Sequence, residues 1–87
     1  MIELLEQKYA IFVILEVLKK PASSKSDIIG KGNERTKYLR IKDMIDNGIL
    51  QTDGVKREHT VMKLYLTPKG QVIANHLKQI VDLDSEM

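Results

Sequence analysis

The sequence predicts a small α+β domain that is mainly α-helical and carries one β-hairpin. Three observations predict this fold class. Long stretches without glycine or proline have apolar residues at helical spacing. Two short extended runs, residues 49–52 and 61–66, flank a polar stretch that contains a glycine. The chain has 87 residues, of which 43% are hydrophobic and 30% charged, as is typical of a single folded domain covering residues 1–87.

The first predicted helix covers residues 3–19, which contain no glycine or proline. A buried strand over residues 9–15 is the alternative, because this run is rich in β-branched side chains. Glutamate, glutamine and lysine flank the run without a helix breaker, and this favours the helix. The five consecutive apolar residues 11–15 point to all sides of such a helix, which is more apolar surface than one small core covers. Pro21 ends the helix.

A short second helix and a tight turn are expected next. Ser24 and Asp27 have the spacing of a capping box, with aspartate in the usual glutamate position, and open a helix that extends through Ile29. Gly30 and Gly32 then permit a tight turn. A sharp turn therefore separates this helix from the next one.

The third helix is expected to begin after the N-cap residue Asn33 and to run to Asn47, where Gly48 supplies a left-handed stop. Its apolar residues are expected to form an inward stripe, made of Tyr38, Ile41, Met44 and Ile45. Four polar residues are left to face outward, namely Arg35, Thr36, Lys37 and Arg40. The third helix is therefore expected to present a basic outer face.

The hairpin is predicted to have a long basic tip over residues 53–60, which contain Gly54. After the hairpin, Thr67 is an N-cap and Pro68 a first helical position, so they open a fourth helix. The last residues, 82–87, are expected to fray. The inward stripe of this helix consists of Ile73, Leu77, Ile80 and Val81.

The formal charge of +2 is unevenly distributed along the chain. Residues 25–43 hold six basic and three acidic side chains, and residues 51–69 hold four basic and two acidic ones. Residues 70–87, in contrast, hold one basic and three acidic side chains. Positive charge thus concentrates in the middle of the chain, which favours an anionic partner such as nucleic acid.

This order of elements resembles the winged helix-turn-helix transcription factors, particularly their compact archaeal and bacterial types. The matching segments are residues 26–29 (SDII), 33–47, 48–50 (GIL) and 66–70 (LTPKG). The last two are the more specific. In these proteins a glycine and two apolar residues lead from the recognition helix into the wing, and an LT-x-KG-like step leaves the wing. The turn over residues 30–33 departs from the pattern because it has two glycines.

The resemblance implies that the third helix enters the major groove of double-stranded DNA, where its N-terminal half contacts base edges and phosphates. The residues expected to do so are Asn33, Arg35, Thr36, Lys37 and Arg40. The wing is expected to touch the minor groove or the flanking backbone through Lys56, Arg57 and His59. The alternative is that both sets are solvated surface charges. The favoured hypothesis is a transcriptional regulator that binds double-stranded DNA sequence-specifically.

A homodimer is the expected assembly, because the first helix is apolar on all sides and a domain of this size often needs reinforcement. The expected dimer surface consists of Phe12, Ile73, Leu77, Ile80 and Val81. In the alternative, the stripe on the last helix only closes the core of the protomer. A two-fold dimer favours a palindromic DNA site.

Two other binding functions are alternatives. Winged-helix domains also serve as protein–protein interaction modules within larger assemblies, although the positive charge of the third helix favours nucleic acid. Binding of RNA or single-stranded DNA ranks third. Phe12 is expected to be buried, and few other aromatic side chains are available for stacking on bases.

The sequence gives little support for catalysis or for a cofactor or metal site. The chain has no cysteine, no grouping of serine, histidine and aspartate and no phosphate-binding loop motif. His59 and His76 are too few and too far apart to suggest a metal site. The longest apolar run, residues 9–15, is far shorter than a membrane span, and the N-terminus does not resemble a signal peptide. A cytoplasmic protein without enzymatic activity is expected.

Overall fold

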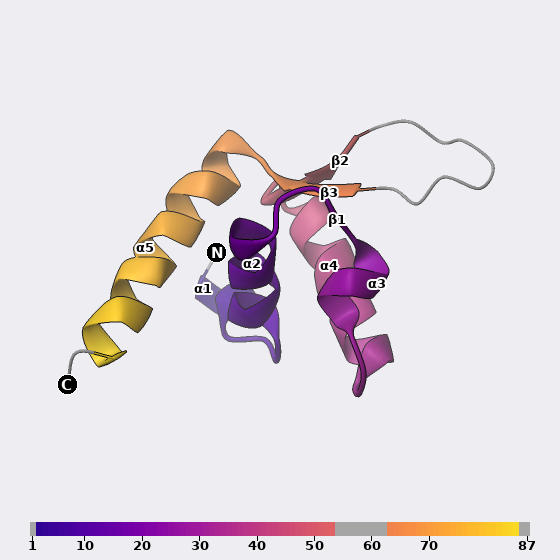
Figure 1. Cartoon of the computed structure of the whole chain (residues 1–87), viewed down its shortest axis with the longest axis horizontal. Coiled ribbons are helices and arrows are strands. Elements are labelled where there is room, and N and C mark those ends of the chain that lie inside the picture. Colours follow the sequence, from indigo (N-terminus) through magenta and orange to yellow (C-terminus); the bar gives the residue numbers. More distant parts are fainter. Residues whose placement is uncertain (1, 54–62, 86–87) are drawn as a thin grey trace.

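The computed structural model describes residues 2–53 and 63–85, which form five helices and one small sheet (Figure 1). The helices are α1 (Ile2–Leu5), α2 (Ala10–Lys19), α3 (Lys25–Ile29), α4 (Glu34–Asp46) and α5 (Pro68–Ser85). The strands are β1 (Ser23–Ser24), β2 (Leu50–Thr52) and β3 (Lys63–Leu66). The predicted α+β class, mainly helical with a small antiparallel hairpin, is confirmed.

The strands are antiparallel and lie in the order β1-β3-β2. Leu50 pairs with Leu66 and Thr52 with Leu64, so β2 and β3 form the predicted hairpin. Strand β1 is an addition to the prediction, and its Ser23 pairs with Leu64. Two residues are too few to show the alternating pattern by which a strand is recognised in a sequence.

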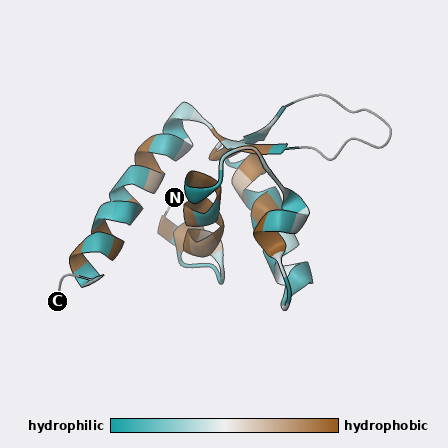
Figure 2. Cartoon of the chain, viewed as in Figure 1, coloured by the Kyte–Doolittle hydropathy of each residue, from teal (hydrophilic) through white to brown (hydrophobic). Residues whose placement is uncertain are grey.

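The buried apolar side chains of the described residues form one core around α2. This helix lies between α5 on one side and α3 with α4 on the other (Figure 1), and hydrophobic residues run along most of its length (Figure 2). The core consists of Ala10, Val13, Ile14, Val17, Ile28, Ile41, Met44, Ile49, Leu50, Leu64, Ala74 and Leu77. Burying each larger aliphatic side chain contributes about 1.5–3 kcal/mol, so packing on α2 fixes where the other helices lie.

The prediction of one continuous helix over residues 3–19 is wrong, because the chain breaks between α1 and α2. Tyr9 has a left-handed backbone there, with φ 67, which costs a residue with a Cβ about 1–2 kcal/mol. Its hydroxyl accepts a hydrogen bond from the Asn33 side chain, and the Lys37 ammonium lies 5.2 Å from its ring centroid. These contacts join Tyr9 to α4 across more than twenty residues of sequence, so local periodicity does not reveal them.

The predicted starts of α3 and α5 are confirmed. The Ser24 side chain accepts the Asp27 backbone N–H at 3.1 Å, and the Asp27 carboxylate accepts the Ser24 N–H at 3.4 Å, which completes the capping box. Thr67 Oγ1 accepts the Gly70 backbone N–H at 3.0 Å, and Pro68 is the first residue of α5. Local side-chain chemistry is enough to set these two helix ends.

Two glycines determine how α4, the sheet and α5 meet. Gly48 has φ 72 and follows the end of α4, as predicted for a left-handed stop. Gly70 is buried, and a Cβ built on it would collide with the carbonyl oxygen of Ile49. The Thr67 N–H donates to that same carbonyl at 3.0 Å. The GIL and LTPKG segments therefore pack directly on one another, which gives both motifs a structural reason.

Helix α5 extends to Ser85 and therefore includes residues 82–85, which were expected to fray. The Ser85 hydroxyl donates to the Val81 carbonyl at 3.0 Å within the last turn. Ile80 and Leu83 are exposed on this part of the helix. Among the described residues, no helix has the length and apolar character needed to span a membrane.

Candidate nucleic-acid interface

Helices α3 and α4 are joined by a turn, residues 30–33, in which three residues have positive φ. These are Gly30 (φ 60), Gly32 (φ 87) and Asn33 (φ 55). Side chains with a Cβ rarely adopt such angles, so the two glycines suit this connection. The double glycine that departs from the family pattern is thus a requirement of the turn.

Helix α4 exposes four side chains that share one face of the helix, and we call this set the outer face. It consists of Arg35, Tyr38, Leu39 and Lys42. Their spacing of three, four and seven residues places them side by side along the helix. The exposed fraction is 49% for Tyr38 and 44% for Leu39. The outer face thus combines two cations with two apolar side chains, and the exposed Asp46 lies on the same side of the helix one turn after Lys42.

The predicted position of Tyr38 in the inward stripe is wrong. Ile41 and Met44 are buried, as predicted, and Ile45 is half-buried. Lys37 takes the inward position one turn before Ile41, and Tyr38 is thereby rotated toward solvent on the side of α3. The aromatic side chain is left free of the core.

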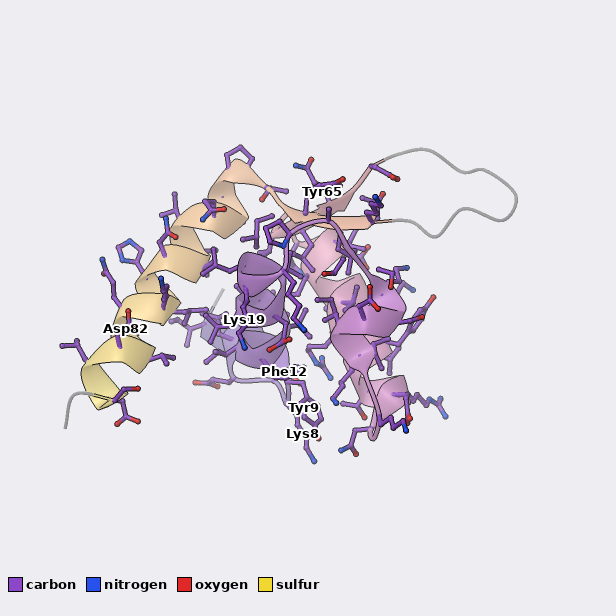
Figure 3. All side chains as sticks on the ribbon, viewed as in Figure 1. Lys8, Tyr9, Phe12, Lys19, Tyr65 and Asp82 are labelled. Carbon is purple, nitrogen blue, oxygen red and sulfur yellow. The ribbon has the colours of Figure 1, made fainter. Side chains whose placement is uncertain are left out.

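The prediction that Lys37 faces outward is also wrong, because this side chain is only 9% exposed. Its ammonium donates a hydrogen bond to the Ile29 carbonyl at 3.0 Å and lies 5.2 Å from the ring centroids of both Tyr9 and Phe12. Figure 3 shows Tyr9 and Phe12 close together at the N-terminal end of α2. A hydrogen bond, two aromatic rings and the end of α3, where carbonyls carry partial negative charge, allow this cation to be buried.

Arg40 was also expected to face outward, but its side chain bonds to other residues of the protein. Its Nε donates to the Lys8 carbonyl at 3.0 Å, and its guanidinium pairs with the Asp43 carboxylate at 2.7 Å. The Arg40 side chain is 14% exposed. The chain break before α2 brings the Lys8 carbonyl within reach, and the sequence showed no sign of this break.

The N-terminus of α4 differs from the predicted arrangement. Asn33 occupies the N-cap position but makes no side-chain cap, and its side-chain amide donates to the Tyr9 hydroxyl. The Glu34 carboxylate instead accepts the Gly32 N–H at 3.0 Å. Backbone hydrogen bonds from Glu34 itself and from Gly32, with the charge of Lys37 in addition, lower the pKa of Glu34. A carboxylate therefore lies where a phosphate was expected to bind.

We call Asn33, Lys37 and Arg40 the anchor, since all three hold α4 against neighbouring segments. The predicted cluster of Arg35, Lys37 and Arg40 on one surface is not formed, because only Arg35 of the three is exposed. Thr36 is half-buried. The predicted wing contacts, Lys56, Arg57 and His59, lie outside the described residues.

Sequence reasoning missed several residues of this surface. Lys42 lies on the outer face, Lys31 is exposed in the turn, and the Lys25 ammonium lies 5.2 Å from the Tyr38 ring centroid. The helical spacing of residues 35, 39 and 42 was the available signal, because these positions lie on the same face. The cationic surface of α3 and α4 consists of Lys25, Lys31, Arg35 and Lys42.

A groove of about 540 Å³ separates part of α2 from α5. Phe12 and Lys19 of α2 and Asp82 of α5 are among its lining residues (Figure 3). Phe12 is 38% exposed, so the prediction that it is buried is wrong. Of the residues expected at a dimer surface, Ile80 and Val81 are also exposed, Ile73 is half-buried and Leu77 belongs to the core.

The order and arrangement of these elements define the fold class of the chain. Helices α3 and α4 form the helix-turn-helix, the antiparallel strands β2 and β3 form the base of the wing, and α5 follows directly. The chain has the winged helix-turn-helix fold, and the resemblance to regulators of this class is confirmed.

The chain is similar to several solved structures. The chain is 27% identical to a possible HxlR family transcriptional factor from Thermoplasma volcanium, over 97% of this chain and 77% of that one, with a TM-score of 0.74. It is 19% identical to Streptococcus pneumoniae FabT, which was solved in complex with DNA, over 98% and 65% of the two chains, with a TM-score of 0.74. Comparison with protein-family models and with curated protein sequences gives no match.

A larger regulator shows the same fold. Staphylococcus aureus MarR, in a complex with salicylate and kanamycin, has a TM-score of 0.76 and 16% identity over 88% of this chain. The chain spans about half of that protein, 53% of its length. The neighbours are thus transcription regulators of the winged-helix class, some of them longer than this chain.

Proposed function

We propose that these residues form one winged-helix domain of a homodimeric, cytoplasmic transcriptional regulator that binds double-stranded DNA sequence-specifically. The observation that carries the proposal is the outer face of α4. It is an exposed helix face with Arg35 and Lys42, on the helix that directly follows the helix-turn-helix turn. The likeness to a transcriptional factor at 27% identity, and to a regulator solved with DNA, supports it.

In the proposed complex α4 lies in the major groove, which is about 12 Å wide and admits one helix. Arg35, near the N-terminal end of α4, faces base edges, where a guanidinium binds guanine with two hydrogen bonds. Lys42 and Lys31 bind phosphates. The anchor keeps α4 at its angle without itself contacting DNA. The hairpin completes the contact through the predicted wing residues Lys56, Arg57 and His59.

The test is a titration of duplex DNA at several salt concentrations, with Arg35→Ala and Lys42→Ala beside the wild type. Loss of a phosphate contact is expected to lower the slope of log K against log salt by about one, while loss of a base contact costs about 1–3 kcal/mol and relaxes specificity. Lys78→Ala is the control, because it removes a cation from α5, across α2 from α4 (Figure 1). Absence of salt-dependent duplex binding by the wild type overturns the proposal.

The proposed homodimer accounts for the exposed apolar residues of α2 and α5. Ile11 and Phe12 of α2, and Ile80, Val81 and Leu83 of α5, are all exposed. Phe12 and Val81 line the same groove, and exposed apolar side chains that lie together often mark association surfaces. Light scattering at micromolar concentration is expected to give the dimer mass for the wild type and the monomer mass for Ile80→Glu, with unchanged helical circular dichroism. A monomeric wild type contradicts the homodimer.

A protein–protein interaction module is the second candidate. The exposed apolar pair Tyr38 and Leu39 favours it, because such side chains also suit a protein partner. In that case, Arg35→Ala and Lys42→Ala leave duplex binding at the level of Lys78→Ala. The titration above therefore separates the two candidates.

A further inference from the structure

Two large apolar side chains lie exposed in the middle of a cationic surface. Tyr38 and Leu39 are on the outer face of α4 between Arg35 and Lys42. The phosphate-binding role of cations does not explain why apolar residues occupy this position. Their placement calls for a ligand that offers hydrocarbon and negative charge within a few ångströms of each other.

The Tyr38 ring is held by a contact from α3. The ammonium of Lys25, the first residue of α3, lies over the ring at 5.2 Å from its centroid. A cation over an aromatic face is worth about 0.5–1 kcal/mol at an exposed site, so the ring is partly ordered before any ligand binds. A preordered side chain loses less conformational entropy on binding. Lys25 also places a positive charge directly beside the exposed ring.

Two acidic side chains near this surface accept backbone hydrogen bonds, and a third, Asp46, is exposed one turn after Lys42. The Asp27 carboxylate accepts the Ser24 N–H, and the Glu34 carboxylate accepts the Gly32 N–H. Around the apolar pair an anionic ligand meets three cations, Lys25, Arg35 and Lys42, and the exposed outer-face carboxylate of Asp46. This balance favours DNA over an apolar protein surface as the occupant.

The length of the outer face fits the rise of a short DNA sequence. Arg35 and Lys42 are seven residues apart, which corresponds to about 10 Å along an α-helix. DNA rises about 3.4 Å per base pair along each strand, so this distance covers about three base pairs. With α4 in the major groove, as proposed above, the apolar pair lies opposite the central part of a three-base-pair segment.

Thymine is the base whose major-groove edge offers hydrocarbon, since its C5 methyl group projects into the groove beside the O4 acceptor. We propose that Tyr38, together with Leu39, reads thymine methyl groups in the major groove, and that Lys25 positions the Tyr38 ring. This inference rests on the proposed function of α4 as a recognition helix. It makes Tyr38 a specificity-determining residue and Lys25 a positioning residue.

The test uses a duplex selected from a random 30-base-pair pool by the wild-type protein and then resynthesised with single thymines replaced by deoxyuridine, which removes only the methyl group. Affinity is measured by fluorescence anisotropy at one salt concentration. At one or two positions, deoxyuridine is expected to weaken wild-type binding by about fourfold, the effect of withdrawing one buried carbon group. Tyr38→Ala is expected to bind the thymine duplex more weakly and to show no further loss with deoxyuridine.

Three further variants sharpen the result. Tyr38→Phe keeps the ring and is expected to keep the sensitivity to deoxyuridine, while Lys25→Met is expected to lower it. Lys78→Ala, on α5, is expected to match the wild type on both duplexes. Equal wild-type affinity for thymine and deoxyuridine duplexes overturns this inference, as does an equal loss on both duplexes for Tyr38→Ala. Those results leave DNA binding itself standing, whereas failure to select any duplex overturns the proposed function.

Discussion

The two faces of α4 use basic residues in opposite ways. On the inner side, Lys37 and Arg40 donate hydrogen bonds to backbone carbonyls of other segments. The acceptors are the carbonyls of Ile29 and Lys8, respectively. On the outer face, Arg35 and Lys42 extend into solvent. Of the six cations in residues 25–43, three are exposed, one, Lys25, is half-buried beside Tyr38, and two stabilise the helix position.

This difference shows that the charge of a helix is a poor guide to its binding surface. Lysine and arginine carry long hydrocarbon stems, which pack on apolar neighbours while the charged end finds a carbonyl or a carboxylate. The Lys37 stem lies in the position of an inward apolar residue, one turn before Ile41. The anchor therefore fixes the direction of α4, and the outer face is left to meet a ligand.

The largest expected effect comes from making the same substitution on each face. Lys37→Met keeps the stem but leaves the Ile29 carbonyl without the ammonium, so the free energy of unfolding is expected to fall by about 1–3 kcal/mol. Arg35→Met is expected to change it by less than about 0.5 kcal/mol, because the side chain is exposed. Urea denaturation of the two variants measures the difference.

DNA binding by the same two variants is expected to show the reverse order. Arg35→Met is expected to weaken duplex binding by about 1–3 kcal/mol and to relax specificity, because Arg35 faces base edges in the proposed complex. Lys37→Met is expected to leave the slope of log K against log salt unchanged, because Lys37 releases no counterion. A lower salt slope for Lys37→Met, with wild-type stability, would falsify the division of α4 into an anchor and an outer face.

A smaller loss of stability is expected for Arg40→Ala, and Lys42→Ala on the outer face is the matched control. Arg40→Ala removes the hydrogen bonds to the Lys8 carbonyl and to Asp43. This is expected to lower the free energy of unfolding by about 1 kcal/mol, because the site is partly screened by solvent. Lys42→Ala is expected to be close to neutral for stability. Hydrogen exchange around residues 6–9 is expected to accelerate in Arg40→Ala alone, and equal exchange in both variants contradicts the role given to Arg40.

Much of the fold could be predicted because its signals are local. Ser24 with Asp27, Thr67 with Pro68, and Gly48 each mark a helix end through the chemistry of adjacent residues, and the structure confirms all three. The break at Tyr9 could not be predicted in this way. Its left-handed backbone depends on partners in α4, and those become neighbours only after the chain folds.

The site was predictable at the level of the helix but not of its side chains. Helix α4 and the exposure of Arg35 follow from the sequence pattern. Lys37, Ile41 and Met44 share the spacing of an apolar stripe, and the charge of Lys37 concealed its inward position. Tyr38 was assigned to the core because it is aromatic. It is exposed because Lys37 occupies the inward position one turn before Ile41.

A further prediction compares two tyrosines, one in contact with the anchor and one on the outer face. Tyr9→Phe removes the hydroxyl that accepts the Asn33 amide but keeps the ring beside Lys37, and is expected to cost about 0.5–1.5 kcal/mol. Tyr38→Phe is expected to be neutral within about 0.5 kcal/mol. Thermal unfolding measures both, and an equal effect of the two substitutions argues against the Asn33 contact.

The smallest effect is expected at Glu34, which is exposed and serves the turn before α4. Its pKa is lowered in the folded protein by backbone hydrogen bonds, so its ionised form stabilises the fold above the ordinary glutamate value of 4.5. That contribution is lost as the pH falls through the lowered pKa.

Glu34→Gln is therefore expected to have a slightly lower Tm than the wild type at pH 7, and the difference should shrink as the pH falls below 4.5. Asp46→Asn, at the unfavourable C-terminal end of the same helix, is expected to shift Tm at pH 7 in the opposite direction. A Glu34→Gln difference that stays constant from pH 7 to well below 4.5 shows that the charge of Glu34 does not hold the turn.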